Sequence, residues 1–239
     1  MFYTNVQPQG NYIALRGVDE HGLTFQRKVR YDPTLYVPAQ RKSDWKTLDG
    51  KPVAPVKWGN MRESRQAMRT YGQDVYGVDQ FQYSFISDKY PGMIVYDISK
   101  VKIAYIDIET SSEYGFPNIR EANEQVLAIS IKMGDDFKVY GCGDFNPPPD
   151  VRYIRCPNEH ALLEAFVDDW KSNYPDIVTG WNTRFFDVPY LVNRITKVHG
   201  SKMANKLSPW GWIRENEVNL MGGRKQQVYD MQGISSIDY

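Results

Sequence analysis

The stretch AYIDIETSSEYGFP, residues 104–117, decides how this sequence is interpreted. It places two acids, Asp107 and Glu109, inside an apolar run. On a β-strand, residues i and i+2 share a face, so both carboxylates point one way while Ile106 and Ile108 point the other way. Like charges repel and are costly to bury, but the pair becomes favourable when divalent cations lie between the carboxylates. As an alternative, the two residues are exposed strand acids without a function.

A third acid strengthens the case for a site. Asp187 lies in GWNTRFFDVPYL, residues 180–191, near the predicted start of a helix that follows a short buried strand. A helix dipole favours an acid there even without a metal, so Asp187 is alternatively a cap, and Asn182 a turn residue. The same loop carries three aromatic residues, Trp181, Phe185 and Phe186. Aromatic rings beside acids offer a stacking surface for nucleic-acid bases.

Composition bounds the class of protein. The 239 residues are 41% hydrophobic, which is enough for one large or two modest domains. The net charge is zero, so the whole-chain charge argues neither for nor against a nucleic-acid partner. Residues 1–100 hold 14 Lys and Arg against 10 Asp and Glu, whereas residues 101–239 hold 15 against 19. Cys142 and Cys156 lack zinc-ligand spacing and are predicted to be reduced thiols.

The pattern of predicted elements changes near residue 100. Residues 1–100 are predicted to form a small β-rich domain. It contains short strands within 2–16 and 23–37, a helix at 61–72 that Gly72 ends, and strands at 80–88 and 92–98.

Residues 101–239 are predicted to form an α/β domain with a mixed sheet. Its elements are strands at 101–110, 125–133 and 137–143, a helix at 158–174 with Asn158 as N-cap, a strand at 176–182 and a helix at 186–199. A hairpin around Gly222-Gly223 follows, and then a strand begins in GISSIDY. Because the chain stops within that element, we expect it to be a fragment. The late basic residues, among them Arg194 and Lys225, are predicted to lie on a solvated surface, with DNA backbone contact as the alternative.

The two acid-containing segments resemble motifs of a known protein family. IDIET (106–110) followed by WNTRFFDVPYL (181–191) resembles the first two exonuclease motifs of family B DNA polymerases. Further stretches, FYTNV, KVRYDPTLYVP, TLDGKPV, YGCGDF and KLSPWG, resemble in the same order the N-terminal portion of the replicative polymerases of T-even-like bacteriophages. The resemblance implies a ribonuclease H-like (DnaQ-like) 3′→5′ exonuclease domain from about residue 101, incomplete at its C-terminal end, after a β-rich N-terminal domain.

The resemblance also implies the roles of the acids. In the family, the motif-one Asp and Glu and the motif-two Asp bind two divalent cations, Mg²⁺ or Mn²⁺. By motif position these ligands are Asp107, Glu109 and Asp187. Asp107 is expected to bridge the ions, Glu109 to hold the ion that carries the attacking water, and Asp187 to serve the other ion. Two such ions activate water and stabilise the leaving oxygen in phosphodiester cleavage.

The implied DNA contacts lie near these acids. Asn182 is expected to touch the substrate strand, Phe116 and Phe186 to contact the terminal bases, and Arg224 to lie at the tip of a hairpin that helps separate primer from template. The family's third motif, which supplies the last metal ligand, lies downstream of this sequence. Asp238 is a weak stand-in for that ligand, and we predict a structural role for it.

These expectations also define the binding partners of the chain and an alternative to its nuclease function. The expected partners are the 3′ end of a primer or single-stranded DNA, RNA at the N-terminal domain, and a C-terminal polymerase fragment that completes the site. The alternative is a nucleic-acid-binding fragment without catalysis. No signal peptide or apolar run of membrane length is present, so we expect no membrane partner and a soluble, intracellular protein. The resemblance to phage polymerases implies that the compartment is the cytoplasm of an infected bacterium.

Overall fold

The computed structural model describes residues 1–113, 115–219, 223 and 225–238. The chain divides into two compact units, Met1–Tyr96 and Asp97–Tyr239. The sequence-based prediction puts the domain boundary between residues 100 and 101. No helix in the described part of the chain is both long enough and apolar enough to cross a membrane.

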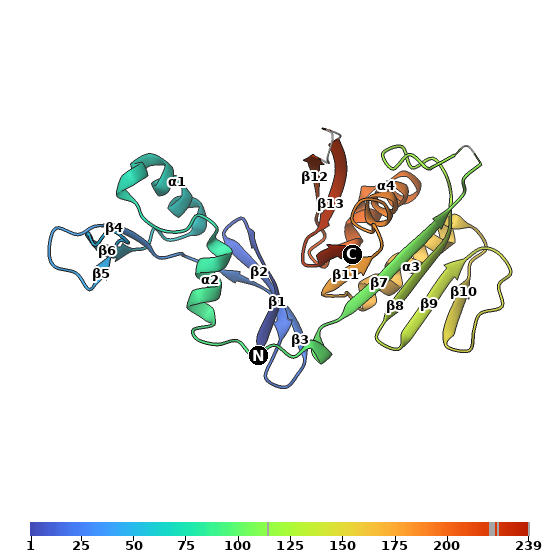
Figure 1. The fold of residues 1–239 in the computed structure, drawn as a ribbon, viewed down its shortest axis with the longest axis horizontal. Coiled ribbons are helices and arrows are strands. Elements are labelled where there is room, and N and C mark those ends of the chain that lie inside the picture. The colour runs from blue at the N-terminus through green and yellow to red at the C-terminus, as the bar shows by residue number, and fades with distance from the viewer. Residues whose placement is uncertain (114, 220–222, 224, 239) are drawn as a thin grey trace. The chain divides into compact units, whose positions relative to one another are not determined.

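The first unit contains two small antiparallel sheets (Figure 1). One has the order β1-β2-β3, with β1 at Phe2–Gln9, β2 at Tyr12–Val18 and β3 at Thr24–Arg30. The other has the order β4-β6-β5, with β4 at Leu35–Pro38, β5 at Trp45–Lys46 and β6 at Pro52–Val56. The central strand β2 buries Ile13 and Leu15 completely, because it is covered on both edges and packs on the core.

Helix α1 (Met61–Tyr71) begins and ends as its sequence predicts. The Asn60 side chain accepts a hydrogen bond from the backbone N–H of Glu63 at 3.0 Å, which satisfies a donor of the first turn. Gly72 adopts a positive φ of 51° at the other end, where a residue with a Cβ is disfavoured. Met61 and Ala67 face the core, so the opposite side of α1 is left exposed.

Two strands predicted in this unit were wrong. Residues 80–88 form helix α2 (Phe81–Lys89), preceded by a 3₁₀ turn at Gly72–Asp74. Phe81 and Phe85, one helical turn apart, are both buried in the core. The aromatic content favours a strand locally, but a helix lets both rings reach the same core. Residues 92–98 contain no strand, since no described strand pairs with them and Met93 and Val95 are exposed.

The second unit is built on a six-stranded mixed sheet of order β10-β9-β8-β7-β11-β14, which confirms the mixed α/β prediction. The strands are β7 (Ile103–Thr110), β8 (Val126–Met133), β9 (Asp136–Gly141), β10 (Val151–Arg155), β11 (Ile177–Gly180) and β14 (Ser235–Asp238). Strands β7, β8 and β9 are antiparallel neighbours. Strand β10 runs parallel to β9, β11 parallel to β7, and β14 parallel to β11. Strands β5, β6 and β10 were not predicted.

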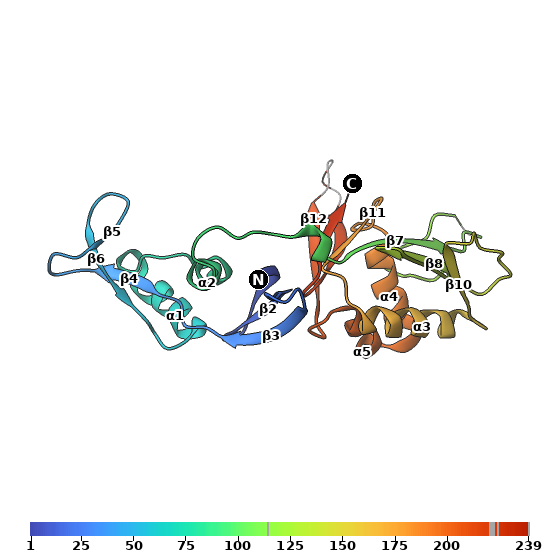
Figure 2. The same cartoon turned by 90° about the horizontal axis from the view of Figure 1, so that it is seen from below.

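Helices cover one face of this sheet (Figure 2). They are α3 (Glu159–Ser172), α4 (Asp187–His199) and the short α5 (Ser201–Ala204), followed by a 3₁₀ turn at Asn205–Leu207. Another 3₁₀ turn, Ile98–Lys100, is exposed and precedes β7. Asn158 caps α3 as predicted, because its side chain accepts from the N–H of Ala161 at 3.0 Å. The apolar stripe of α3 packs on the sheet, so this face forms the core of the unit.

A buried ion pair joins α3 to α4. Arg194, 8% exposed, donates to both carboxylate oxygens of Glu159 at 2.7 and 2.6 Å. Its Nη1 donates to the carbonyls of Ala122 and Asn123 at 2.9 and 2.8 Å. The prediction that Arg194 lies on a solvated surface was therefore wrong. The alternative, contact with a DNA backbone, was also wrong, because the N–H groups of Arg194 donate to Glu159, Ala122 and Asn123 inside the fold.

Strands β12 (Ile213–Asn219) and β13 (Lys225–Met231) pair antiparallel, with Asn219 opposite Lys225. This confirms the predicted hairpin. The predicted tip residues Gly222 and Arg224 lie outside the described residues, so the expected role of Arg224 stays a prediction. Lys225 lies in an exposed ion pair with Glu217 at 3.0 Å.

Candidate active site

Strand β7 presents its two acids to solvent. Asp107 and Glu109 are exposed, whereas Ala104, Ile106 and Ile108 are buried. The helices cover only the face to which the isoleucines point. The two carboxylates therefore share one open face of the sheet, and neither is forced into the core.

The next strand along the sheet ends early. The pairing of β11 with β7 stops at Thr179 opposite Tyr105, and the chain then turns at Asn182, whose φ is 55°. Beyond this point the edge of β7 has no strand beside it on that side. The carboxylate of Asp187 takes the vacated position, because its Oδ1 accepts from the backbone N–H of Ile108 at 3.0 Å.

Close packing at Gly180 makes this turn possible. A Cβ at position 180 would lie 2.5 Å from the carbonyl oxygen of Ile106 and would also collide with the hydroxyl of Thr183. Real Cβ atoms do not approach a backbone oxygen so closely. The glycine therefore lets the loop that carries Asn182 and Asp187 lie directly against β7.

We expect Gly180→Ala to lower the free energy of unfolding by about 1–3 kcal/mol, because the added methyl overpacks a backbone contact. Chemical denaturation followed by circular dichroism measures the change. Gly143→Ala is the matched control, since a Cβ there meets no atom within 4 Å and the residue has no positive φ. Equal stability of the two variants would show that the contact at Gly180 is not needed.

Asp187 is held in an unusual electrostatic environment. The side chain belongs to the first residue of α4 and is 2% exposed. Burial, together with the nearby carboxylates of Asp107 and Asp238, raises its pKa to about 7, against the opposing hydrogen bond from Ile108. Asp238 Oδ1 is itself buried without a hydrogen-bond partner in the described structure. The backbone of Asp238 has the predicted structural role, because it pairs with Gly180 in the β11–β14 ladder. Its carboxylate also adds negative charge near Asp187.

The raised pKa has a consequence for stability. An Asp with a pKa of 3.8 when unfolded and about 7 when folded binds its proton more tightly in the folded chain. The free energy of unfolding therefore falls as the pH rises from about 4 to about 7. We expect a loss of roughly 2 kcal/mol between pH 5 and pH 8 in EDTA, which Asp187→Asn abolishes. Urea unfolding at the two pH values measures it, and parallel pH profiles for both proteins would contradict the assignment.

The carboxylates at this edge of β7 fit a binding site for a hard divalent cation only in part. Among the described residues, no group of three or more Asp, Glu, His or Cys side chains is gathered closely enough to hold a metal ion. Carboxylates are nevertheless the preferred ligands of Mg²⁺ and Mn²⁺, and Asp238 offers an oxygen without a partner. The structure brings Asp187 near Asp107 and Asp238, but it does not gather Asp107, Glu109 and Asp187 into one coordination sphere.

The predicted base-contacting rings do meet. The rings of Phe116 and Phe186 lie 5.2 Å apart, and Phe116 is 81% exposed. A groove runs beside them between the loop after β7 and the β12–β13 hairpin, and an Arg120–Glu217 ion pair at 3.4 Å joins its two sides. The groove is lined by Phe116, Pro117, Asn118, Ile119, Arg120, Glu217, Lys225, Gln226 and Gln227.

Asn182 has a visible structural role. Its backbone carbonyl accepts from the N–H groups of Phe185 and Phe186 at 3.0 and 2.9 Å, which forms the turn before α4. Its side chain is exposed, so the predicted contact with a substrate strand stays a prediction.

Sequence reasoning missed a second groove, on the open face of the sheet beside Asp107. Lys132 lies directly opposite Tyr105 in the β7–β8 register and lines this groove with Asp107 and the exposed ring of Trp181. The alternation in β8 was the available signal, because it puts Ser130 and Lys132 on the same face as the acids.

Comparisons with known proteins identify the fold's family. Residues 52–239 match the family described as DNA polymerase family B, exonuclease domain. The whole chain is similar to the DNA-directed DNA polymerases of Enterobacteria phage T4, with 31% identity, and of Escherichia phage RB69, with 30% identity. It spans 30% of the length of each of these relatives. A stretch covering 41% of the chain is 30% identical to 10% of a DNA polymerase from Archaeoglobus fulgidus.

This family implies a ribonuclease H-like fold, with which the mixed sheet and its one-sided layer of helices agree. The match to the family covers well over half of the chain, including every acid of the site. The chain belongs to the exonuclease-domain family of the family B DNA polymerases.

Proposed function

We propose that the chain is the N-terminal and exonuclease portion of a replicative DNA polymerase and that it removes nucleotides from DNA 3′ ends during proofreading. The observation that carries the proposal is the set of acids at the vacated edge of β7. Asp187 is buried there beside Asp107 and Asp238, and its pKa is raised to about 7. Strongly perturbed acids beside other charged groups cluster at functional sites.

In this proposal Asp107, Glu109 and Asp187 hold two Mg²⁺ or Mn²⁺ ions. Bound divalent ions would supply an activated water and offset the negative charge that grows on the cleaved phosphate. The side chains have distinct tasks. Asp107 and Glu109 present charge from a rigid strand, and Asp187 is oriented by the hydrogen bond from Ile108. Asp187 must be ionised to act as a ligand, so its raised pKa makes metal binding stronger at higher pH.

A further group completes the ligand set in this proposal. Three acids are not gathered around one point in the described residues, and the phage relatives are about three times longer than this chain. We infer that the last ligand comes from outside these 239 residues, on a C-terminal polymerase portion that is the chain's partner. RNA at the N-terminal unit and action in the cytoplasm of an infected bacterium belong to the same proposal.

The substrate strand is proposed to enter along the groove beside Phe116. The Phe116 and Phe186 rings would stack on the terminal bases, while Asn182 and Arg224 would contact the strand. Stacking on aromatic side chains is tolerant of base identity, which suits an enzyme that must remove any mismatched nucleotide.

We expect Phe116→Ala to weaken binding of a frayed primer end by about 1–3 kcal/mol, because one stacking surface is lost. The KM for a primer with mismatched 3′ bases, measured with the polymerase portion present, should rise while the unfolding midpoint stays unchanged. Phe145→Ala is the matched control, since Phe145 is an exposed ring outside the groove. An unchanged KM for Phe116→Ala would contradict the assigned contact.

The direct test is degradation of a 5′-labelled single strand by the chain, alone and with the polymerase portion. We expect shortening from the 3′ end that requires Mg²⁺ or Mn²⁺ and stops in EDTA. A phosphorothioate at the 3′-terminal linkage should slow the first step. Internal cleavage, shortening from the 5′ end, or no degradation under either condition would overturn the proposal. The alternative of a non-catalytic nucleic-acid-binding fragment is not favoured, because the matched family is a nuclease domain.

A further inference from the structure

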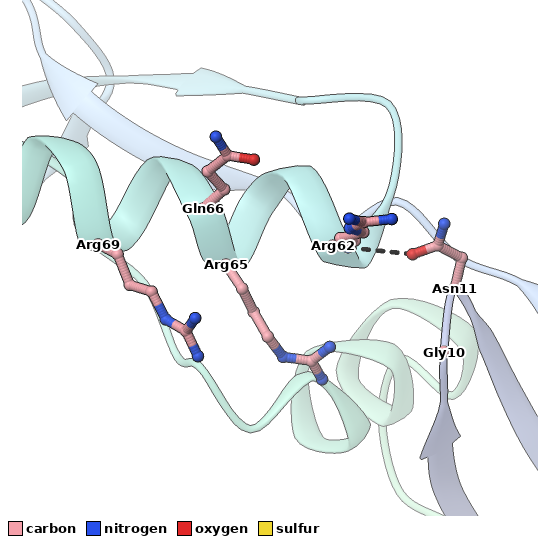
Figure 3. A pocket seen from close by; sticks show the side chains of 6 residues that line it. All are labelled: Gly10, Asn11, Arg62, Arg65, Gln66 and Arg69. Carbon is pink, nitrogen blue, oxygen red and sulfur yellow. Dashed lines mark hydrogen bonds between the residues drawn. The ribbon is translucent and has the colours of Figure 1, made fainter.

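A groove in the first unit is lined only by polar and basic residues (Figure 3). One wall is the turn between β1 and β2, and the other is the exposed side of α1. The lining residues are Gly10, Asn11, Arg62, Arg65, Gln66 and Arg69. No acidic or apolar side chain lines the groove, so its lining is suited to an anion and to little else.

The three arginines are held but not neutralised. Within residues 1–96, all of which the structure describes, no carboxylate lies within ion-pair distance of Arg62, Arg65 or Arg69. Glu63, the single acid of α1, does not line the groove. Like charges spaced three and four residues apart destabilise a helix, so stability does not explain this arrangement. A ligand of opposite charge would relieve the repulsion between them.

The frame around the arginines is rigid. The side chain of Asn11 accepts from the backbone N–H of Arg62 at 3.1 Å, which ties the turn to the start of α1. The backbone carbonyl of Asn11 accepts from the N–H of Tyr31 at 3.3 Å. The guanidinium of Arg65 lies 4.8 Å from the centre of the Phe81 ring, a buried ring of the core. The groove is therefore formed before a ligand arrives.

The spacing of the arginines fits a chain of phosphates. Arg62, Arg65 and Arg69 follow one another at roughly 4.5 and 6 Å along the helix axis. Arg65 and Arg69 extend from the same side of α1, and Arg62 lies beside Asn11 (Figure 3). Guanidinium groups bind phosphate oxygens in a two-pronged geometry. A row of them suits successive phosphates better than one small anion.

Two exposed aromatic side chains are neighbours in sequence of residues in this groove. Tyr12 directly follows Asn11 and is 46% exposed, and Tyr71 comes two residues after Arg69 and is 58% exposed. Basic side chains that follow a backbone, together with rings on which bases stack, are typical of single-strand binding. We propose that this groove binds the phosphodiester backbone of single-stranded DNA, through Arg62, Arg65 and Arg69. This site is separate from the nuclease acids, and its existence does not depend on nuclease activity.

The test compares two double variants of the full chain in EDTA, so that no strand is degraded. Binding of a dye-labelled oligo(dT) is followed by fluorescence anisotropy over a range of salt concentrations. For Arg62→Ala with Arg69→Ala, we expect the dissociation constant to rise roughly tenfold. The slope of log K against log salt should become shallower by about 1.4, because each lost phosphate contact removes about 0.7. Arg65 is left unchanged, since it also packs on Phe81.

Arg41→Ala with Lys46→Ala is the matched control, because it removes the same charge from exposed residues of the same unit. Circular dichroism confirms the fold of each protein. An unchanged dissociation constant for the groove variant, or an equal rise in the control, would overturn the proposal. Equal weakening on oligo(U) would support a backbone contact, whereas binding of RNA but not DNA would overturn the assignment to DNA. Because binding is measured without metal, its outcome does not depend on whether the proposed nuclease activity exists.

Discussion

Replacing Asp107 by Ala should reduce metal-dependent degradation of DNA 3′ ends by roughly a thousandfold or more, while the fold is retained. Asp107 is exposed on β7, so its side chain contributes little packing. It is also one of the two carboxylates that raise the pKa of Asp187. Its removal should therefore lower the pKa of Asp187 and relieve the repulsion between the two carboxylates. At pH values above 7, the urea midpoint of unfolding should stay the same or increase.

The measurement needs two readouts from one protein. The degradation rate tests the proposed ligand, and the pH dependence of unfolding in EDTA tests the coupling between Asp107 and Asp187. Asp135→Ala is the matched control, because Asp135 is an exposed acid in the turn between β8 and β9 of the same sheet. Retained activity in Asp107→Ala would remove this residue from the site. An equal loss of activity in Asp135→Ala would show that the effect comes from the loss of one negative charge and not from the position of Asp107.

Replacing Arg194 by Leu should lower the free energy of unfolding by about 3–5 kcal/mol. The substitution leaves Glu159 as a buried charge without its partner, and it leaves the carbonyls of Ala122 and Asn123 without their donor. Glu159 also accepts from the backbone N–H of Val126 at 2.7 Å, at the start of β8. We therefore expect loosening where α3, α4 and β8 meet.

Urea unfolding of the variant measures this loss. Arg152→Leu is the matched control, because Arg152 makes a 3.5 Å ion pair with Asp136 that is largely exposed and is expected to contribute no more than about 1 kcal/mol. The double change Glu159→Leu with Arg194→Leu should recover part of the stability, since it removes both charges. A loss below about 1 kcal/mol in Arg194→Leu would show that the pair is not important for folding.

Several parts of the molecule were predictable from local sequence. Alternation in AYIDIE assigned the two faces of β7, because a strand has a two-residue period. Asn158 and Asn60 precede helices that their side chains cap. The hairpin of β12 and β13 was predictable from strand-like arms around two glycines. In each case the deciding interactions lie within a few residues, so the sequence pattern carries them.

Other parts were not predictable because they depend on distant residues. The aromatic run from Phe81 to Phe85 became a helix, since both rings had to reach one core. Arg194 became buried because Glu159, on another helix, lay within reach of it. The basic row on α1 was visible as an R-x-x-R-x-x-x-R pattern, but only the turn at Asn11 makes it one wall of a groove.

The sequence by itself determined the family motifs, the shared face of Asp107 and Glu109, and a mixed α/β unit, because strand periodicity and motif order are local properties of the chain. Only the tertiary structure decided where Asp187 and Asp238 lie. The early end of β11 leaves the N–H of Ile108 unpaired by a strand, and Asp187 fills that position. Burial beside two other carboxylates then sets its pKa, since electrostatic coupling depends on distance in space and not on separation along the chain.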